Sequence, residues 1–245
     1  MRNRIISILS LSALPLLAVA QPSGEDILDA IDRNLSSETR VYEARMIIHG
    51  ARGTRTVAFT SWAEGDTRAF TEYTDPPREQ GTKMLKLEDM LWIYSPSTDR
   101  TIQITGHMLK QSVMGSDLSY EDMMNDTPLK EQYKVTSVTS LVYSETDCWM
   151  LELVATDPEA AYQQRKMWID KQLNIPLKEE LYAKSGKLLK RTELSMVEKI
   201  DGRWYPRRIV FRDMLKSGDG TEFIVDKIEF NTEIPPHLLT KAALR

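Results

Sequence analysis

An alternation of apolar and polar residues with period two constrains this chain most strongly, and it runs from just after Arg40 to Phe230. Such alternation places successive side chains on opposite faces of a β-strand. Turn-forming residues interrupt it every 8 to 14 residues or so, as at Ser185-Gly186 and Asp201-Gly202, which is roughly the spacing of hairpins. No helical period separates the strands, so the pattern predicts an antiparallel meander and not a βαβ fold.

The runs expected to form strands are Val41 to His49, Thr54 to Trp62, Thr67 to Tyr73, Lys83 to Leu87, Met90 to Tyr94, Arg100 to Ile104, Tyr133 to Tyr143, Cys148 to Val154, Lys166 to Ile169, Leu177 to Ala183, Leu188 to Val197, Trp204 to Met214 and Thr221 to Phe230. Some of them, such as Met90 to Tyr94, contain no charged residue on either face. In an antiparallel sheet with one solvent-exposed face, apolar and polar residues should alternate along each strand. These strands are therefore expected to be covered on both sides, either inside a sandwich or in a curved sheet that wraps around helices or a ligand.

One amphipathic helix is expected before the first strand, from Ser23 to Leu35. Ser23 is suited to the N-cap position, and Glu25 and Asp26 follow in the first turn, where acidic side chains are favourable. Apolar residues recur with helical spacing from Ile27 to Leu35. We interpret this helix as a plug against one side of the sheet.

Residues 1–20 have the features of an export signal. Arg2 and Arg4 precede an apolar run that ends in Ala18-Val19-Ala20, which predicts cleavage after Ala20. No later stretch is long and apolar enough to predict a transmembrane segment. Without residues 1–20 the chain loses two arginines and no acidic residue, so its formal net charge becomes more negative than −4. A nucleic-acid-binding protein is not expected, because phosphate neutralisation requires a basic face.

The mature chain, residues 21–245, is expected to form a single domain, because no linker or repeat divides it. It has 41% hydrophobic and 28% charged residues, typical of a globular protein, and a single cysteine, Cys148. One cysteine cannot form an intramolecular disulfide, so the fold must depend on a packed core. Cys148 begins an apolar strand pattern, which favours a buried thiol over a reactive one.

The segment from Gly106 to Leu129 breaks the strand pattern and holds four of the twelve methionines. Ser119 and Asp122 have the spacing of a capping box, which predicts a short helix from Tyr120 to about Asn125. That helix would point Met123, and either Tyr120 or Met124, inward. We interpret the segment as a lid, since methionine adapts to partners of varying shape. An ordinary core loop is an equally good interpretation of these residues alone.

No catalytic constellation is apparent. The sequence has no Gly-x-Ser-x-Gly, His-Glu-x-x-His, Cys-x-x-Cys or phosphate-loop motif. The histidines His49, His107 and His237 have no His or Cys at metal-ligand spacing, so neither a metal site nor a cofactor is expected. The acidic residues near Asp117 fit a solvated helix start better than an acid–base pair. We therefore do not expect an enzyme.

Two stretches resemble the outer-membrane lipoprotein-sorting protein family, a branch of the LolA/LolB-like superfamily. The first is the strand and turn Trp92-x-Tyr94-x-Pro96-x-x-x-Arg100, and the second is Met114-Gly-Ser-Asp-Leu-Ser-Tyr-Glu-Asp122. The matching motif residues outside the expected binding set are Pro96, Arg100, Gly115, Ser116, Asp117, Ser119, Glu121 and Asp122. The order of elements along the mature chain also resembles that of the family.

The resemblance implies a mainly β (α+β) fold, an incomplete antiparallel β-barrel shaped like a half-pipe, with an N-terminal helix and a helical lid over the concave apolar face. It further implies a periplasmic carrier that binds a lipid or a lipoprotein acyl chain and transfers it towards the outer membrane. The partners would be an inner-membrane transporter of the RND type and an outer-membrane acceptor. Residues expected to line or gate the cavity are Met90, Trp92, Tyr94, Met108, Met114, Leu118, Tyr120, Met123 and Met124.

Two other functions are compatible with the sequence. A periplasmic sensor or adaptor would use the same cavity for a signal, and a sheet edge or the lid for an RND-type exporter or a membrane regulator. A lipid-active enzyme would need an acid–base pair among Asp117, Glu121, Asp122 and His107. The basic cluster of Lys184, Lys187, Lys190 and Arg191 could meet anionic lipid, although such a cluster is also typical of a solvated hairpin.

Overall fold

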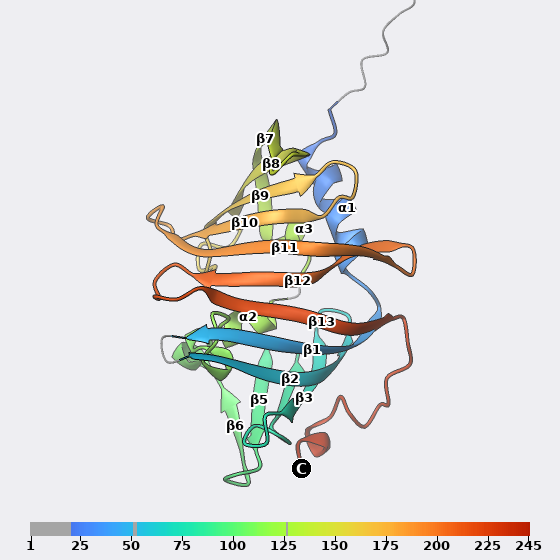
Figure 1. Cartoon of the computed structure of the whole chain (residues 1–245), viewed down its shortest axis with the longest axis vertical. Helices are drawn as coiled ribbons and strands as arrows, with labels where there is room; N and C mark the ends of the chain where they lie inside the picture. Colours follow the sequence, from blue (N-terminus) through green and yellow to red (C-terminus); the bar gives the residue numbers. More distant parts are fainter. Residues whose placement is uncertain (1–20, 51–52, 126) are drawn as a thin grey trace, which may run out of the picture.

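The computed structural model describes residues 21–50, 53–125 and 127–245. The predicted export signal, residues 1–20, lies outside the described residues. Within the described ranges the chain forms thirteen strands in one antiparallel sheet, with a few short helices (Figure 1). All thirteen runs expected from the alternation are strands, with differences of only a few residues at their ends.

The strands are β1 (Thr39–Gly50), β2 (Gly53–Glu64), β3 (Arg68–Asp75), β4 (Lys83–Leu87), β5 (Met90–Ser95), β6 (Arg100–Ile104), β7 (Tyr133–Tyr143), β8 (Thr146–Ala155), β9 (Gln164–Asp170), β10 (Pro176–Tyr182), β11 (Leu188–Ile200), β12 (Arg203–Asp213) and β13 (Gly220–Phe230). The α-helices are α1 (Gly24–Leu35), α2 (Tyr120–Met124) and α3 (Leu129–Gln132), and the 3₁₀ helices are η1 (Gly106–Lys110), η2 (Val113–Gly115) and η3 (Lys241–Leu244).

The strand order explains why the sheet is open. Strands β1 and β13 pair at its centre, where Arg40 lies opposite Phe230. From this seam, hairpins run outward to β6 at one edge and to β7 at the other. The two edge strands are consecutive in the sequence, and the described residues between them, 105–125 and 127–132, cross one face of the sheet. We call these residues the crossover segment. The result is a half-barrel that is not closed, as predicted.

Helix α1 covers the part of the sheet formed by β7 to β9. Ser23 is the N-cap, as predicted, and its side chain accepts from the Asp26 backbone N–H in a capping box. The buried side chains Ile27, Leu28 and Ile31 pack against apolar residues of β7, β8 and β9. Gly24 lies so close to β7 that a Cβ atom there would be 2.4 Å from Val135. The predicted plug is therefore present, with glycine at its tightest contact.

The other half of the sheet is covered on both faces. On the concave face, Met46, Phe59, Tyr73 and Leu91 belong to a buried cluster that also contacts the crossover segment. On the outer face, residues 231–245 return over β3 to β5. This C-terminal segment packs its buried residues Ile234, Leu239 and Leu244 against Phe70, Leu85 and Trp92. The chain's own C-terminus thus accounts for strands that are apolar on both sides.

Cys148 is fully buried, as predicted from its apolar surroundings. Burial raises the pKa of its thiol, which suppresses the reactive thiolate.

Candidate functional site

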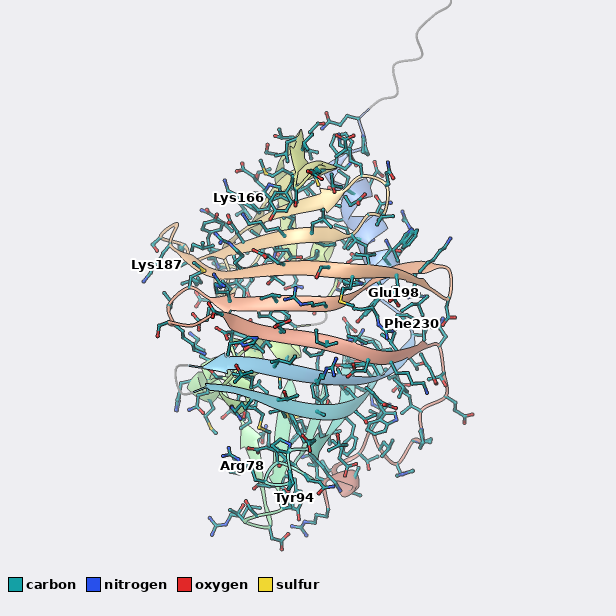
Figure 2. All side chains as sticks on the ribbon, viewed as in Figure 1. Arg78, Tyr94, Lys166, Lys187, Glu198 and Phe230 are labelled. Atoms are coloured by element: carbon teal, nitrogen blue, oxygen red, sulfur yellow. The ribbon has the colours of Figure 1, made fainter. Side chains whose placement is uncertain are left out.

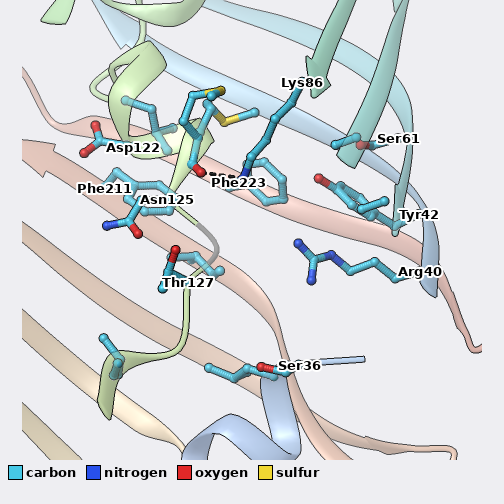
Figure 3. Close-up of a pocket in the computed structure, with 18 of the residues that line it drawn as sticks. Ser36, Arg40, Tyr42, Ser61, Lys86, Asp122, Asn125, Thr127, Phe211 and Phe223 are labelled. Carbon is cyan, nitrogen blue, oxygen red and sulfur yellow. Dashed lines mark hydrogen bonds between the residues drawn. The ribbon is translucent and has the colours of Figure 1, made fainter. Parts of the chain in front are cut away.

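A cavity of about 390 Å³ lies between the concave face of the sheet and the crossover segment (Figure 3). Its volume is within the usual range of small-molecule sites, roughly 300–1,000 Å³. Most of its wall is apolar. The apolar lining residues are Leu35, Tyr42, Ala63, Ala69, Met84, Leu91, Leu118, Met123, Met124, Pro128, Leu129, Leu194, Tyr205, Pro206, Ile209, Phe211 and Phe223.

Helix α2 forms one side of this cavity and brings Met123 and Met124 to it. The helix starts at the predicted capping box, in which the Ser119 side chain accepts from the Asp122 backbone N–H. The C-terminal end of α2 is held by a side chain of the sheet. The Lys86 Nζ of β4, a residue only 6% exposed, donates to the Met124 carbonyl oxygen at 2.5 Å and to the Asp66 carbonyl oxygen at 2.5 Å. A lysine at a helix C-terminus stabilises its last carbonyls.

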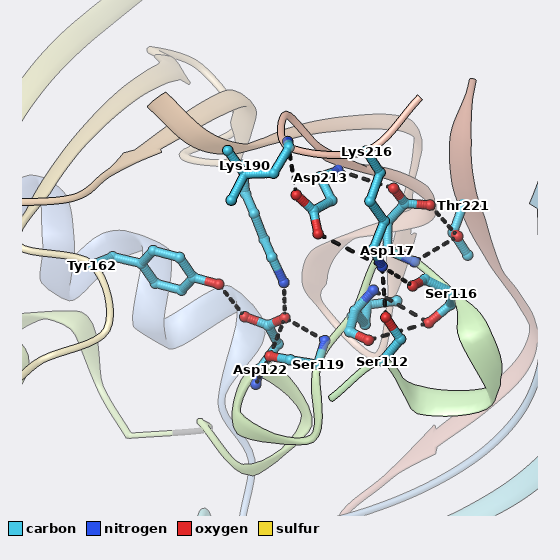
Figure 4. Close-up of polar contacts among 12 residues, drawn as sticks. Ser112, Ser116, Asp117, Ser119, Asp122, Tyr162, Lys190, Asp213, Lys216 and Thr221 are labelled. Carbon is cyan, nitrogen blue, oxygen red and sulfur yellow. Dashed lines mark hydrogen bonds and ion pairs between the residues drawn. The ribbon is translucent and has the colours of Figure 1, made fainter. Parts of the chain in front are cut away.

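Asp122 attaches the start of α2 to the opposite half of the sheet (Figure 4). Its carboxylate forms an ion pair with Lys190 of β11 and accepts a hydrogen bond from the Tyr162 hydroxyl at 2.6 Å. Burial raises the pKa of this carboxyl, but the Lys190 charge and the hydrogen bonds outweigh burial, so the pKa lies below its ordinary value. Burial and the Asp122 charge raise the pKa of Tyr162, so its hydroxyl keeps its proton. The contacts of Asp122 and the Lys86 contact together attach α2 to both halves of the sheet.

The preceding part of the crossover segment is anchored to the β12–β13 hairpin. The Asp117 carboxylate accepts from the Asp213 backbone N–H at 3.0 Å and from the Thr221 hydroxyl at 2.8 Å. Lys216 Nζ donates to the Ser112 hydroxyl at 2.6 Å and to the Ser116 carbonyl oxygen at 2.8 Å. Asp117 and Asp122, two of the four residues considered for an acid–base pair, therefore hold the crossover segment in place.

Gly115 is the residue at which the crossover segment turns. Its φ of +68° is in the left-handed region that favours glycine, and a Cβ atom there would be 2.9 Å from the Arg55 guanidinium. Ser116 is fully buried next to it, and its hydroxyl accepts from the Leu118 backbone N–H at 3.2 Å. Glu121 lines a shallow groove beside α2. These motif residues shape the segment.

The cavity also has a polar side. Asp32 in α1, Arg40 in β1, Arg165 in β9 and Glu179 in β10 line it. Arg165 and Glu179 form an ion pair at 3.7 Å. Burial raises the pKa of Asp32, and the Leu129 backbone N–H that donates to its carboxylate opposes this only in part. The cavity is therefore amphipathic, which suits a ligand with an apolar chain and a polar end.

The structure separates the residues expected at the cavity into three groups. Leu118, Met123 and Met124 line it. Met108, Met114 and Tyr120 pack against the neighbouring buried cluster of the concave face. The third group lies elsewhere, and it consists of Met90, Trp92 and Tyr94.

Trp92 and Tyr94 correct the expectation most clearly. They share a face of β5, as predicted, but this is the outer face, and they pack under the C-terminal segment, where Lys241 Nζ lies 4.1 Å from the centroid of the Trp92 ring. Leu91, on the other face of β5, reaches the cavity instead. Met90 is 42% exposed at the start of the strand.

Pro96 and Arg100 are at the β5–β6 turn, away from the cavity. Both are exposed. The Tyr94 hydroxyl donates to the Asp99 carboxylate at 3.1 Å within the same turn, and Arg100 pairs with Ser95 in the sheet register. The first family motif therefore marks a strand and its turn.

Lys86 was missed by the sequence reasoning, although a signal was present. Met84 and Lys86 are two residues apart on the short strand β4, so they share a face. A lysine on a buried face indicates a specific partner. Arg40, Phe211 and Phe223 gave no such signal, because their places at the cavity depend on pairing between distant strands.

An open antiparallel half-barrel with a cavity on its concave face is the LolA-like fold, and solved structures agree. An outer membrane lipoprotein-sorting protein domain from Vibrio parahaemolyticus has a TM-score of 0.78 at 23% identity, covering 89% of this chain and 97% of that one. A DUF1329 family protein from Desulfovibrio piger has a TM-score of 0.79 at 23% identity, and the match covers 91% of this chain and 98% of that one. A LolA superfamily protein from Nitrosomonas europaea has a TM-score of 0.74 at 22% identity, and the match covers 91% of this chain and 100% of that one.

A family model described as "Uncharacterized protein" matches residues 65–245, and the chain belongs to this DUF1329-like family. No curated protein matches the sequence. Among the described residues, no helix is long and apolar enough to cross a membrane, and no group of three or more His, Cys, Asp or Glu side chains is placed to hold a metal ion.

Proposed function

We propose that this protein is a periplasmic carrier, which binds a lipid or the acyl chain of a lipoprotein in the cavity and transfers it towards the outer membrane. The mature protein, residues 21–245 after cleavage at Ala20, is a single domain that receives its cargo at the inner membrane, from an RND-type transporter, and delivers it to an outer-membrane acceptor. The observation that carries the proposal is the mainly apolar cavity under α2. The predicted export signal and the fold shared with a lipoprotein-sorting domain support it.

The cavity explains how a carrier can bind without bond chemistry. Each buried methylene contributes about 0.8 kcal/mol, so roughly ten methylenes supply about 8 kcal/mol, which corresponds to a Kd of about 1 µM. The polar residues Asp32 and Arg40 would face the polar end of the ligand. Affinity of this kind depends little on which acyl chain is bound, which suits a carrier of acylated molecules.

Release requires a movement, and we propose that α2 is the lid that moves. Side chains from the two halves of the sheet hold its ends: Lys86 at one end, and Lys190 with Tyr162 at the other. A partner that competes for these contacts would shift the lid towards an open state. The methionines Met123 and Met124 would then leave the cavity with the helix.

Native mass spectrometry with organic extraction tests the proposal on mature protein purified from the periplasm without detergent. We expect a bound lipid or acylated peptide. The double variant Met123→Asp with Met124→Asp should lose it, because two carboxylates would face the apolar cavity. The control is Met196→Asp, because Met196 is 59% exposed on β11. A wild-type protein that stays empty after incubation with lipid vesicles and lipoproteins would refute the carrier, and full cargo in the double variant would refute the lid.

A further inference from the structure

Two loops at one end of the half-barrel form a surface that the proposed carrier function does not use. They are residues 183–187 between β10 and β11 and residues 214–219 between β12 and β13. The loops are neighbours, since Lys190 pairs with Asp213 in the sheet and the Met214 backbone N–H donates to the Leu189 carbonyl oxygen at 2.8 Å. Figure 1 shows both hairpins at the same end of the sheet, and Figure 2 shows Lys187 at the outer end of the first. We call these two loops the hairpin rim.

The hairpin rim combines exposed apolar side chains with positive charge. Leu215 is 59% exposed and Met214 is 38% exposed. Lys184, Lys187 and Lys216 are exposed beside them, and the two loops hold these three lysines against one acidic residue, Asp219. The chain as a whole has a formal net charge of −4. Lys216 forms an ion pair with Asp213 at 3.6 Å, so Lys184 and Lys187 supply the positive charge that the rim presents beside Leu215 and Met214.

Hydrogen bonds hold the exposed apolar residues outward. The Asp213 carboxylate accepts from the Leu215 backbone N–H at 2.9 Å, and the Asp213 carbonyl oxygen accepts from the Lys216 backbone N–H at 3.1 Å. Lys216 Nζ is fixed to Ser112 and Ser116 of the crossover segment. A fixed loop that presents a leucine to solvent loses little conformational freedom on binding, which favours association.

We propose that the hairpin rim docks on the surface of an anionic phospholipid bilayer. Leu215 and Met214 enter the headgroup region, while Lys184 and Lys187 face lipid phosphates. Apolar side chains flanked by lysines have the chemistry of an interfacial membrane contact, since burial and attraction to anionic lipid add together. Few residues take part, so the contact is weak and reversible, as a protein that leaves the membrane again requires.

The rim is next to α2, the helix that we propose as the lid. Lys190, three residues after Lys187 on the same hairpin, is the ion-pair partner of Asp122 in α2, and Lys216 contacts the segment that leads into α2. Docking at the rim would therefore place α2 close to the bilayer. The inference goes beyond the carrier proposal, because vesicle binding does not require an occupied cavity.

Co-sedimentation of the mature protein tests the proposal with vesicles of phosphatidylglycerol mixed with phosphatidylcholine, and with vesicles of phosphatidylcholine alone. We expect binding to the anionic vesicles only, falling as salt is added. Two variants, Lys184→Glu with Lys187→Glu and Met214→Ser with Leu215→Ser, should each bind at least about tenfold more weakly. The matched control is Met196→Ser with Lys199→Glu, because Met196 is as exposed as Leu215 and Lys199 is near the opposite end of β11.

Wild-type protein that does not bind anionic vesicles at low salt, and instead associates only with a membrane protein, would overturn the proposal. So would a control variant that is weakened as much as the rim variants. Circular dichroism of each variant shows whether it is folded. Cargo measured by native mass spectrometry should be unchanged in the rim variants. A rim variant that loses vesicle binding but keeps its cargo would show that the rim acts in docking alone. A wild-type protein that binds vesicles but has an empty cavity would contradict the carrier proposal and leave the docking proposal standing.

Discussion

Asp122 is the residue on which the position of α2 depends most. Its side chain is 14% exposed and that of its partner Lys190 is 12% exposed. The same carboxylate accepts from the Ser119 backbone N–H at 2.6 Å, which completes the capping box. Removing one member of such a pair leaves a buried charge without its partner. One side chain thus connects the helix start, the ion pair and the Tyr162 hydroxyl.

We predict that Asp122→Asn lowers the free energy of unfolding by about 3 kcal/mol at neutral pH, measured by urea denaturation. Asp29→Asn is the control, because the ion pair of Asp29 with Lys130 is at the surface, with exposed fractions of 39% and 50%. That change should cost much less, because solvent screens an exposed ion pair. Equal losses in the two variants would contradict the assigned role of Asp122.

The difference in free energy of unfolding between wild type and Asp122→Asn should depend on pH, because the pKa of Asp122 is lowered in the folded state. A carboxyl whose pKa is lower in the folded state stabilises the fold above its unfolded pKa, and the stabilisation is lost as the pH falls through the folded pKa. The difference between wild type and Asp122→Asn should therefore be constant down to about pH 5 and shrink below about pH 4. Urea midpoints measured across this range check it, and a difference that grows in acid would contradict it.

At the scale of elements, the C-terminal segment covers the face of β5 that points away from the cavity. Residues Ile234, Leu239 and Leu244 are nearly fully buried against the outer face of β3 to β5. Without them, Trp92 would expose a large apolar surface to water. The segment has no strand of its own, and only the short helix η3 is regular. It contributes buried apolar side chains together with hydrogen bonds to the sheet, as where the Leu239 carbonyl oxygen accepts from the Arg68 guanidinium at 3.0 Å.

Leu239→Ala should lower the free energy of unfolding by about 2–4 kcal/mol, since Leu239 is 4% exposed and the substitution leaves a cavity against Phe70 and Trp92. Leu215→Ala is the matched substitution at a 59% exposed leucine, and its effect should be within about 0.5 kcal/mol. The urea midpoints of the two variants give the comparison. A neutral Leu239→Ala would show that the segment does not stabilise the sheet.

At the scale of the whole molecule, the half-barrel surrounds its cavity with residues from both halves of the sheet. Leu91 and Met84 belong to the half that precedes the crossover segment, and Leu194 and Ile209 belong to the half that follows it. A ligand that contacts both halves binds the folded state and not the unfolded chain. Binding must then stabilise the fold as a whole.

Removal of the cargo that we propose for the cavity should therefore lower the thermal midpoint. A ligand present at 100 times its Kd stabilises the folded state by about 2.7 kcal/mol, which for a chain of this length corresponds to roughly 5–10 °C. Differential scanning calorimetry of protein before and after organic extraction and refolding measures the shift, and added lipid should restore it. The Met123→Asp with Met124→Asp variant should show no such recovery, and recovery equal to wild type would place the ligand elsewhere.

The sequence by itself determined the elements. Alternation fixed the strands, because a β-strand must sort its side chains by face. Ser23 and Ser119, each followed by an aspartate three residues later, fixed the starts of α1 and α2, because capping is a contact within one turn. The methionines of the crossover segment drew attention to Met123 and Met124, which line the cavity. All of these signals act over a few neighbouring residues.

Only the tertiary structure decided which face of each strand became concave. Trp92 and Leu91 are adjacent, and alternation places them on opposite faces without saying which face curves inward. The answer depends on the pairing of β1 with β13, on the crossover between the two sheet edges and on the returning C-terminus. These contacts join residues far apart in the chain, and their free energy comes from burial in the assembled sheet, which no local pattern records.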